Sequence, residues 1–310
     1  MNRYIARRLL QFFPVLLGAL TLLFVALFIL PGDPVQALLG ERPVPPAFRE
    51  AIIEKYGLDK PMPVQYLRYL NRLAHFDLGD SSSQHREVWT IIKERVPVTA
   101  RLGLAGSFFV IALGVGSGLI SAVRRYSWSD AAVTVGTIVL VSIPVFVLAL
   151  MLQIFALKTK SIFDLPISGL NAGLKSYILP GFALGAVSSA YVSRLQRTSL
   201  LETLQADYVR TARSKGLRER RVVLNHAWRN ALIPVVTYLG LDIGTLLTGA
   251  VLTESVFNIP GLGRTLAFGV AAKDNQVVLG ISIFILLVYL VANLVVDILY
   301  AVLDPRIRYQ

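Results

Sequence analysis

The sequence predicts an all-α protein that crosses a membrane several times. Hydrophobic residues make up 55% of the chain and charged residues 16%, and the mean hydropathy is +0.61. Soluble domains are roughly 45 to 50% apolar. The apolar residues also gather in stretches of about 20, the length that a helix needs to cross the hydrocarbon layer. We therefore expect a polytopic membrane protein and not a soluble enzyme.

Six apolar stretches are predicted to be transmembrane helices. The first stops at a Pro-Gly-Asp-Pro turn, residues 31–34, where proline disfavours further helix. Its length and the absence of a small-residue cleavage site predict an uncleaved anchor and not a signal peptide. The fourth is the shortest and carries Ser188, Ser189 and Ser193, which favours burial among helices because hydroxyl groups need partners in hydrocarbon. The predicted spans are residues 9–30, 98–123, 131–157, 178–192, 231–252 and 277–303.

Basic residues predict the orientation of these spans. Short cytoplasmic loops carry an excess of Lys and Arg, and one side of the predicted bundle has that excess. Both termini are therefore expected in the cytoplasm. The same placement accounts for the net charge of +12, so nucleic-acid binding is not expected, whereas contact with membrane lipid is. The residues on this side are Arg3, Arg7, Arg8, Arg124, Arg125, the basic residues from Arg194 to Arg229, Arg306 and Arg308.

Missing residues exclude several kinds of chemistry. The chain has no cysteine, which excludes disulfides, thiolate catalysis and Cys-ligated metals. His75, His85 and His226 are too far apart to show metal-ligand spacing. No Gly-x-x-x-x-Gly-Lys-Ser/Thr loop is present. We expect no catalytic, cofactor or metal site, and any ATP must bind to another subunit.

The long segment between the first two spans is predicted to be a helical cap outside the cytoplasm. Residues 48–56, 64–73 and 88–96 each show partial helical spacing of apolar side chains. The sequence thus divides into residues 1–97, an anchor helix with its extracytoplasmic cap, and residues 98–310, a core of five spans.

The cytoplasmic segment 194–230 contains a predicted amphipathic helix. Leu201, Leu204, Tyr208 and Ala212 share one helical face, and Gly216 stands where a helix C-terminal cap is common. Three explanations of this stripe remain open from the pattern alone. The helix could lie on the bilayer surface, pack on the cytoplasmic ends of the spans, or dock on a partner protein.

Two further features are candidates for function. The external loop 254–264 contains Pro260-Gly261 and Gly263, which predict a defined turn before a re-entrant or interfacial helix at 266–272. This loop could be purely structural, or it could contact an external partner or cap a pathway. In the fifth span, Asp242 lies one turn from Tyr238, and a carboxylate at membrane depth needs either a buried hydrogen bond or a polar pathway.

Small residues and prolines predict how the helices pack and bend. The pairs Gly114/Gly118, Gly181/Gly185 and Gly240/Gly244 have the spacing that lets helix backbones approach closely. Prolines at 144, 180 and 234 should bend or start spans.

Several motifs together resemble the permeases of the bacterial dipeptide, oligopeptide and nickel ABC importer family. Asp207-Tyr208-Val209-Arg210-Thr211-Ala212-Arg213-Ser214-Lys215-Gly216-Leu217, followed by 226–234 (His-Ala-Trp-Arg-Asn-Ala-Leu-Ile-Pro), is similar to that family's coupling loop. The external Glu254-Ser255-Val256-Phe257 with Pro260-Gly261-Leu262-Gly263, the opening 4–10, the 31–34 turn and the ending 303–306 resemble the same family. Of the broader importer pattern Glu-Ala-Ala followed by Gly, only Ala212 and Gly216 are kept.

The resemblance implies a type I ABC importer fold and a set of site residues. It implies a coupling helix near 202–217 that sits in a cleft of an ATP-binding subunit, with Ala212 and Gly216 allowing close approach. The external loop would face a substrate-binding protein or its ligand. The implied ATPase-coupling residues are Asp207, Tyr208, Arg210, Thr211, Ala212, Arg213, Lys215, Gly216 and Leu217; those of the external loop are Glu254, Phe257, Asn258, Pro260, Gly261, Gly263 and Arg264; Tyr238 and Asp242 are candidates for the pathway.

The resemblance also implies partners, location and cargo. The long 31–98 segment is similar to that of the first of two different permease subunits, which implies a heterodimer with a sister permease. Two ATP-binding subunits carrying ATP and Mg, and an external binding protein, would complete a multi-pass complex of the bacterial inner membrane. The implied function is import of di- or oligopeptides. The alternatives are import of nickel chelates, glutathione or oligosaccharides, or a proton-coupled secondary transporter with Asp242 as the charge carrier.

Overall fold

The computed structural model describes residues 2–28, 35, 45–56, 59–75 and 77–303. Within these residues the protein is helical without β-strands, and an isolated β-bridge joins Asp80 and Glu87. The chain forms two compact units, one from Met1–Thr99 with Pro260–Gln310 and one from Ala100–Ile259. The predicted 31–34 turn lies outside the described residues.

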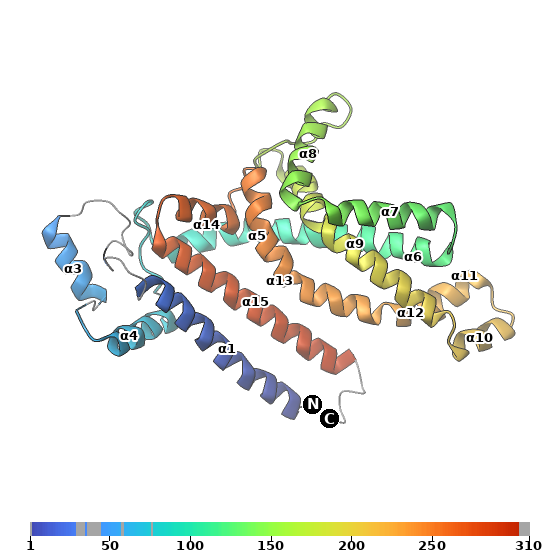
Figure 1. Ribbon diagram of the computed structural model, residues 1–310, viewed down its shortest axis with the longest axis horizontal. Coiled ribbons are helices and arrows are strands. Elements are labelled where there is room, and N and C mark those ends of the chain that lie inside the picture. Colours follow the sequence, from blue (N-terminus) through green and yellow to red (C-terminus); the bar gives the residue numbers. More distant parts are fainter. Residues whose placement is uncertain (1, 29–34, 36–44, 57–58, 76, 304–310) are drawn as a thin grey trace. The chain divides into compact units, whose positions relative to one another are not determined.

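The first unit contains the first helix, the cap and the last two helices. Helices α1 and α15 lie side by side (Figure 1), and α4 packs on α1 through rings: Phe24 lies 5.2 Å from Tyr66 and 5.5 Å from Tyr69. The cap is therefore held to the anchor helix by an apolar contact, because buried aromatic rings remove much surface from the solvent. The helices of this unit are α1 (Asn2–Phe28), α3 (Pro46–Tyr56), α4 (Met62–Ala74), the first part of α5 (Val88–Phe109), α14 (Leu262–Ala271) and α15 (Asn275–Leu303).

A buried carboxylate holds the loop between α4 and α5 to the start of α15. Asp274 accepts hydrogen bonds from Ser81 Oγ at 2.6 Å, Ser83 Oγ at 2.6 Å and Ser83 N at 2.9 Å, and it caps α15 through Val277 N at 3.2 Å. Burial acts to raise the pKa of Asp274, but these hydrogen bonds to the charged form outweigh burial and lower the pKa below its usual value. The charged carboxylate thus stabilises the first unit.

The second unit is built around α9. Its helices are the last part of α5, the π-helical η1 (Val110–Val115), α6 (Gly116–Val123), α7 (Trp128–Ser142), α8 (Val145–Lys158), the 3₁₀-helical η2 (Gly173–Tyr177), α9 (Ile178–Thr203), α10 (Asp207–Ser214), α11 (Glu219–Arg221), the π-helical η3 (Val222–Ala227), α12 (Trp228–Ala231) and α13 (Ile233–Val256). Helix α9 contacts η1, α6, α7, α8, α12 and α13. The predicted burial of the fourth span is confirmed, since 67% of its 18-residue apolar segment is buried. The corresponding shares for the other two long spans are 28% and 22%.

Glycine explains how other helices come so close to α9. A Cβ atom at Gly114 would lie 2.9 Å from Ser189 O, and one at Gly118 would lie 2.5 Å from Ser193 O. On α9 itself, a Cβ at Gly185 would lie 2.5 Å from Gly106 O. Side chains at these positions have no room, because contacts this short overlap van der Waals surfaces. The predicted packing role of these glycines is confirmed.

The structure corrects the predicted spans in two places. The span predicted at 131–157 is two helices, α7 and α8, bent by 108°. The bend follows from Pro144, since Ile143 before it takes an extended conformation (φ −93°, ψ 122°). The predicted cap helix 88–96 and the second span form one continuous apolar helix, Val88–Val123. By length and composition, three helices of the described residues can cross a membrane, or four when α7 and α8 count as one span.

The tight packing at α9 predicts opposite effects for two alanine substitutions on α6. Gly118→Ala should destabilise the protein by about 1 to 3 kcal/mol, since the new methyl group must displace Ser193 or Gln196. Gly116→Ala is the matched control, because a Cβ there meets nothing within 4 Å and alanine favours helix. Thermal unfolding of the purified protein in detergent checks this. Equal effects of the two substitutions would contradict the packing argument.

The buried carboxylate predicts a pH-dependent substitution effect. Asp274→Asn should lower stability at neutral pH by about 1 to 3 kcal/mol, because buried donors lose a charged acceptor. Since the pKa of Asp274 is lowered in the folded state, its contribution is present above the ordinary pKa and is lost as pH falls through the lowered value. The difference in unfolding free energy between the unaltered protein and Asp274→Asn should therefore become smaller at acidic pH. Asp77→Asn, in the loop between α4 and α5, should show no such change, because Asp77 is exposed and accepts a hydrogen bond from Gly79 N.

Candidate functional site

The predicted cytoplasmic helix is present, but it is shorter than expected. Residues 202–217 were expected to form one helix. Instead, α9 continues to Thr203, a turn follows in which Ala206 N donates to Thr203 O at 3.1 Å, and α10 starts at Asp207. Ala206 is extended (ψ 148°), so the apolar stripe from Leu201 to Ala212 is not continuous. The short helix α10 therefore has its own direction after the turn.

Helix α10 has two distinct faces. Val209 and Ala212 are buried, with 0% and 6% of their surface exposed, in a cluster with Leu200 of α9, Ala122 of α6 and Val222 of η3. The opposite face is exposed and follows the i, i+3, i+4, i+7 spacing of a helix. Its residues, called here the outer face of α10, are Asp207, Arg210, Thr211 and Ser214.

This arrangement corrects the expected role of Ala212. The small side chain was expected to allow a partner to approach closely, but it lies in the chain's own core. Leu217 also packs against that core. Gly216 is exposed and has a positive φ of 74°, which glycine adopts at little cost, so it ends the helix as predicted.

Polar contacts fix both ends of α10. Arg213 donates to both carboxylate oxygens of Glu219, at 2.7 and 3.1 Å, and to Leu204 O at 3.3 Å. The hydrogen bond from Arg213 lowers the pKa of Glu219. Asn230 Nδ2 donates to Tyr208 Oη at 2.8 Å. The helix is therefore attached to the turn before it and to the segments that follow it.

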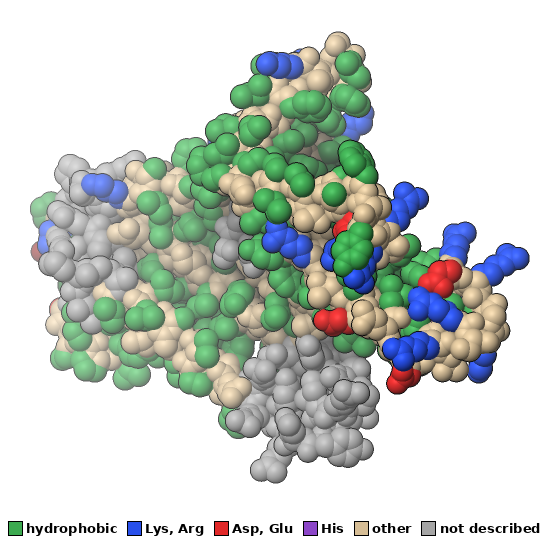
Figure 2. Space-filling view, turned by 45° about the vertical axis from the view of Figure 1, so that its right-hand side comes forward, with side chains coloured by type: hydrophobic (Ala, Val, Ile, Leu, Met, Phe, Trp, Pro, Cys, Tyr) green, Lys and Arg blue, Asp and Glu red, His purple; other side chains and the backbone are tan. Residues whose placement is uncertain are grey.

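The exposed surface around α10 is strongly basic. Figure 2 shows Lys and Arg side chains projecting at the end of the second unit that contains α10 and α11. Between residues 207 and 221 the acidic residues are Asp207 and Glu219. The ion pair between Arg210 and Asp207 is long, at 3.5 Å, and exposed. Such pairs contribute little to stability, so these charges are available to a partner. The exposed basic residues are Arg210, Arg213, Lys215, Arg218, Arg220 and Arg221.

The 254–264 loop, which was predicted to be external, is mostly a packed turn. Glu254, Phe257, Gly261 and Gly263 are buried, whereas Asn258 is exposed and has a positive φ of 55°. In the second unit, Gly169 N donates to Phe257 O at 2.9 Å. A partner could reach Asn258, but the buried residues serve the turn.

The remaining loop residues belong to the first unit. Leu262 N donates to Thr99 Oγ1 at 2.8 Å, and Arg95 Nη1 donates to Pro260 O at 3.3 Å. Arg264 lies over the Phe268 ring at 4.9 Å. The helix predicted after the turn is α14, which begins at Leu262, earlier than expected.

The candidate pathway residues lie on α13 against α9. Asp242 is 3% exposed, and its Oδ1 accepts from Ser188 Oγ at 2.9 Å. Its Oδ2 has no hydrogen-bond partner among the described residues. Tyr238, one turn earlier, lies 6.4 Å from the Tyr191 ring on α9. The structure thus shows the hydrogen bond expected for a buried carboxylate and leaves one oxygen for another group.

Sequence reasoning missed a polar cluster where α6 ends, α7 begins and α9 approaches its C-terminal end. Asp130 and Arg197 form a bidentate ion pair there. An Asp at a helix start and an Arg in a basic segment are both common. Because 67 residues separate these two, no local sequence pattern indicates that they are in contact. Among the described residues, no group of three or more His, Asp or Glu could hold a metal ion.

Two family models match the chain. The model described as "Binding-protein-dependent transport system inner membrane component" covers residues 114–309, and its N-terminal companion covers residues 1–103. A solved structure of the MetNI methionine ABC transporter has a similar fold, with a TM-score of 0.57, 18% identity, and coverage of 70% of this chain and 97% of that one. Because the identity is low, this likeness establishes the fold alone, which is that of ABC importer permeases.

Curated relatives match over the full length of both chains. The di/tripeptide transport system permease protein of Pseudomonas aeruginosa is 38% identical, and the dipeptide transport system permease protein of Escherichia coli K12 is 36% identical. The glutathione transport system permease protein of Pectobacterium atrosepticum is 40% identical. In each case 100% of both chains is covered. The chain therefore belongs to the dipeptide and oligopeptide permease family of ABC importers, whose members are transport subunits of the inner membrane.

Proposed function

We propose that this chain forms part of the translocation pathway of an ATP-driven importer of short peptides. The observation that carries the proposal is the two-faced helix α10. Its inner face is fixed in the core of the second unit, and its outer face is exposed among the described residues and bordered by basic side chains. A partner that moves α10 would thereby move α9 and α6, which share its core.

The finer topology belongs to this proposal. Six spans with both termini in the cytoplasm require α1, the α5–α6 helix, the bent α7–α8 pair, α9, α13 and α15 each to cross the membrane once. The basic residues at α10 and in the α6–α7 loop support one cytoplasmic side. The division into residues 1–97 and 98–310 is supported by the two family models, which separate between residues 103 and 114.

The proposed complex contains a sister permease, two ATP-binding subunits and an external binding protein. ATP and Mg would bind to the ATP-binding subunits, where closure of the nucleotide sites moves α10. The basic surface around α10 suits an acidic cleft, while the exposed Ser255 and Asn258 are residues of the 254–264 loop that the binding protein can reach. Lipid surrounds the apolar helices.

Short peptides are the proposed cargo. The full-length relatives named above are permeases for dipeptides, di/tripeptides and glutathione, and glutathione is itself a tripeptide. These molecules share a free ammonium group and a carboxylate. Nickel chelates and oligosaccharides lack this pattern, and membership of the ABC family disfavours a proton-coupled carrier.

The outer face of α10 predicts the effect of a bulky substitution. Thr211→Trp should abolish co-purification of the ATP-binding subunits, because an indole on this face cannot fit a cleft shaped for threonine. ATP-driven peptide uptake into proteoliposomes should fall by about 100-fold or more, as expected for a lost interface anchor. Thermal unfolding of the permease itself should be unchanged, since Thr211 is exposed.

The matched control is Lys160→Trp, which adds the same indole to an exposed residue beyond α8. It should leave both association and uptake intact. If Thr211→Trp still binds the ATP-binding subunits as tightly as the unaltered chain, α10 is not the docking helix and the proposed function loses its main support.

Asp242 predicts a second effect, on the handling of cargo. Asp242→Asn keeps an acceptor oxygen for Ser188 but removes the charge that would attract a peptide ammonium group. Uptake of peptides should weaken by about tenfold, equivalent to about 1.4 kcal/mol, while ATP hydrolysis by the complex continues. Ser188→Ala is the companion variant, since it removes the hydrogen bond and retains the charge. Unchanged peptide uptake by Asp242→Asn would remove Asp242 from the pathway.

A further inference from the structure

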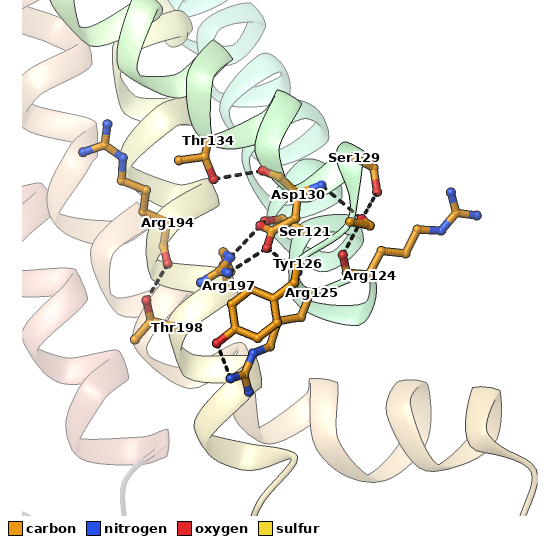
Figure 3. Close-up of polar contacts among 11 residues, drawn as sticks. Ser121, Arg124, Arg125, Tyr126, Ser129, Asp130, Thr134, Arg194, Arg197 and Thr198 are labelled. Carbon is orange, nitrogen blue, oxygen red and sulfur yellow. Dashed lines mark hydrogen bonds and ion pairs between the residues drawn. The ribbon is translucent and has the colours of Figure 1, made fainter.

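The polar cluster around Asp130 joins three helices at the cytoplasmic end of the second unit. Arg197 of α9 donates Nε to Oδ1 and Nη2 to Oδ2 of Asp130, both at 2.8 Å (Figure 3). Ser121 of α6 donates its hydroxyl to Oδ1, and Tyr126 N donates to Oδ2 at 2.9 Å. All the strong acceptor positions of this carboxylate are therefore in use.

The local backbone holds Asp130 in this position. Ser127 is the N-cap of α7, and its Oγ accepts from Asp130 N at 3.3 Å. Tyr126, in the tight loop before it, has a positive φ of 62°, which costs energy for a residue other than glycine. Arg125 lies over the Tyr126 ring at 4.3 Å. The loop is held in one conformation because its amide donates to the same carboxylate.

The carboxylate of this ion pair is buried, and the guanidinium is partly exposed. The side chains of Asp130 and Arg197 are 7% and 29% exposed. A bidentate guanidinium–carboxylate pair fixes direction as well as distance. A hydrophobic contact of the same size could give as much stability, but it would lack this directional constraint between α7 and α9.

One turn further into the unit, the same helices meet again. Ser117 Oγ donates to Ser193 Oγ at 2.8 Å. Ser117 precedes Ser121 by one turn on the same helical run, and Ser193 precedes Arg197 by one turn on α9. Between these two contacts, Gly118 leaves no space between α6 and α9. The serine pair and Gly118 thus fix the position of α6 along α9, and the Asp130 cluster fixes α7 on the same two helices.

Helix α9 leads directly from this cluster to α10. Arg197 lies less than two turns before the end of α9 at Thr203, and α10 begins after the turn. Any displacement of α10 reaches α9 near Arg197 before it reaches Ser188 and Asp242.

We propose that Asp130 and Arg197 are positioning residues that make the α6–α7 hairpin move with α9 when the partner ATPase displaces α10. The inference rests on the proposed docking role of α10. Without the ion pair, the apolar contacts of α10 pass its motion to α6 and α7 only in part, so ATP hydrolysis continues but drives little transport.

The first test is Asp130→Asn in the assembled complex in proteoliposomes. Asparagine keeps an acceptor for Ser121 and loses the charge that pairs with Arg197. The permease should still bind its ATPase, and the number of peptides imported per ATP hydrolysed should fall by about tenfold, within the range of coupling between sites. An unchanged ratio would overturn the proposal.

Arg194 and Arg197, which are neighbours on α9, provide a matched comparison. Arg197→Gln should lower the transport ratio as Asp130→Asn does. Arg194→Gln removes the same charge one turn earlier, from an exposed side chain that points away from the cluster (Figure 3), and should leave the ratio unchanged. Equal losses in the two variants would indicate a general effect of charge and would overturn the proposal.

A reversible cross-link tests the same point independently of folding. The chain has no cysteine, so Ser117→Cys with Ser193→Cys introduces one defined thiol pair. In the otherwise unaltered chain, oxidation should leave uptake intact, because α6 and α9 move together. If the cross-link stops uptake, these helices must move relative to each other and the proposal is wrong.

In the Asp130→Asn background, oxidation of the same thiol pair should restore the transport ratio and reduction should remove it again. Both states come from one folded sample, which excludes a folding defect as the cause. Failure of oxidation to restore the ratio counts against the proposal.

The proposed docking of α10 and the proposed role of the ion pair fail in different ways. If Thr211→Trp leaves the ATPase bound, the docking role of α10 fails. If docking holds and Asp130→Asn has no effect on the transport ratio, only the inference about the ion pair fails.

Discussion

The close approach of other helices to α9 is the constraint on which the second unit depends. Gly114 and Gly118 let η1 and α6 touch the α9 backbone, and Gly185 on α9 does the same for the end of α5. Within a membrane, apolar side chains gain little by leaving lipid, so close van der Waals contact and interhelical hydrogen bonds supply much of the association. Glycine makes both possible at once.

Helix α9 also connects the three features to which we assign proposed roles in transport. Its middle carries Ser188, which bonds to Asp242 on α13. Its C-terminal part carries Arg197, which binds Asp130, and the chain then turns into α10. An element that packs on so many others cannot shift alone, because a close-packed interior has few voids. Motion at α10 therefore spreads to the helices around α9.

The two faces of α10 explain how a short surface helix can transmit motion. The inner face, through Val209 and Ala212, gives it an apolar attachment to the core. The bidentate contact between Arg213 and Glu219 holds the segment after it in place. An isolated helix of this length is unstable in water, so its conformation comes from these contacts. A partner bound to the outer face thus acts on a preformed element.

Much of the fold could be predicted from the sequence, because long apolar runs and their glycine spacing report directly on membrane helices. Burial of α9 followed from its serines, and the start of α10 lay within the predicted segment. The bend at Pro144 could be located but not measured, since proline disfavours helix without setting the angle. Which face of α10 packs inward could not be predicted, because Ala212 fits either a core or an interface. The contact between Asp130 and Arg197 depends on tertiary structure, so no local pattern announces it.

The most direct test of the account is to map which side of α10 meets the ATPase in the assembled complex. Since the chain has no cysteine, single cysteines at 207, 210, 211 and 214 can each be joined to a photoreactive cross-linker, with one at 160 as reference. If α10 docks on the ATP-binding subunit, that subunit should be captured from the four α10 positions and not from 160. Capture of lipid alone from all four positions would contradict the docking of α10.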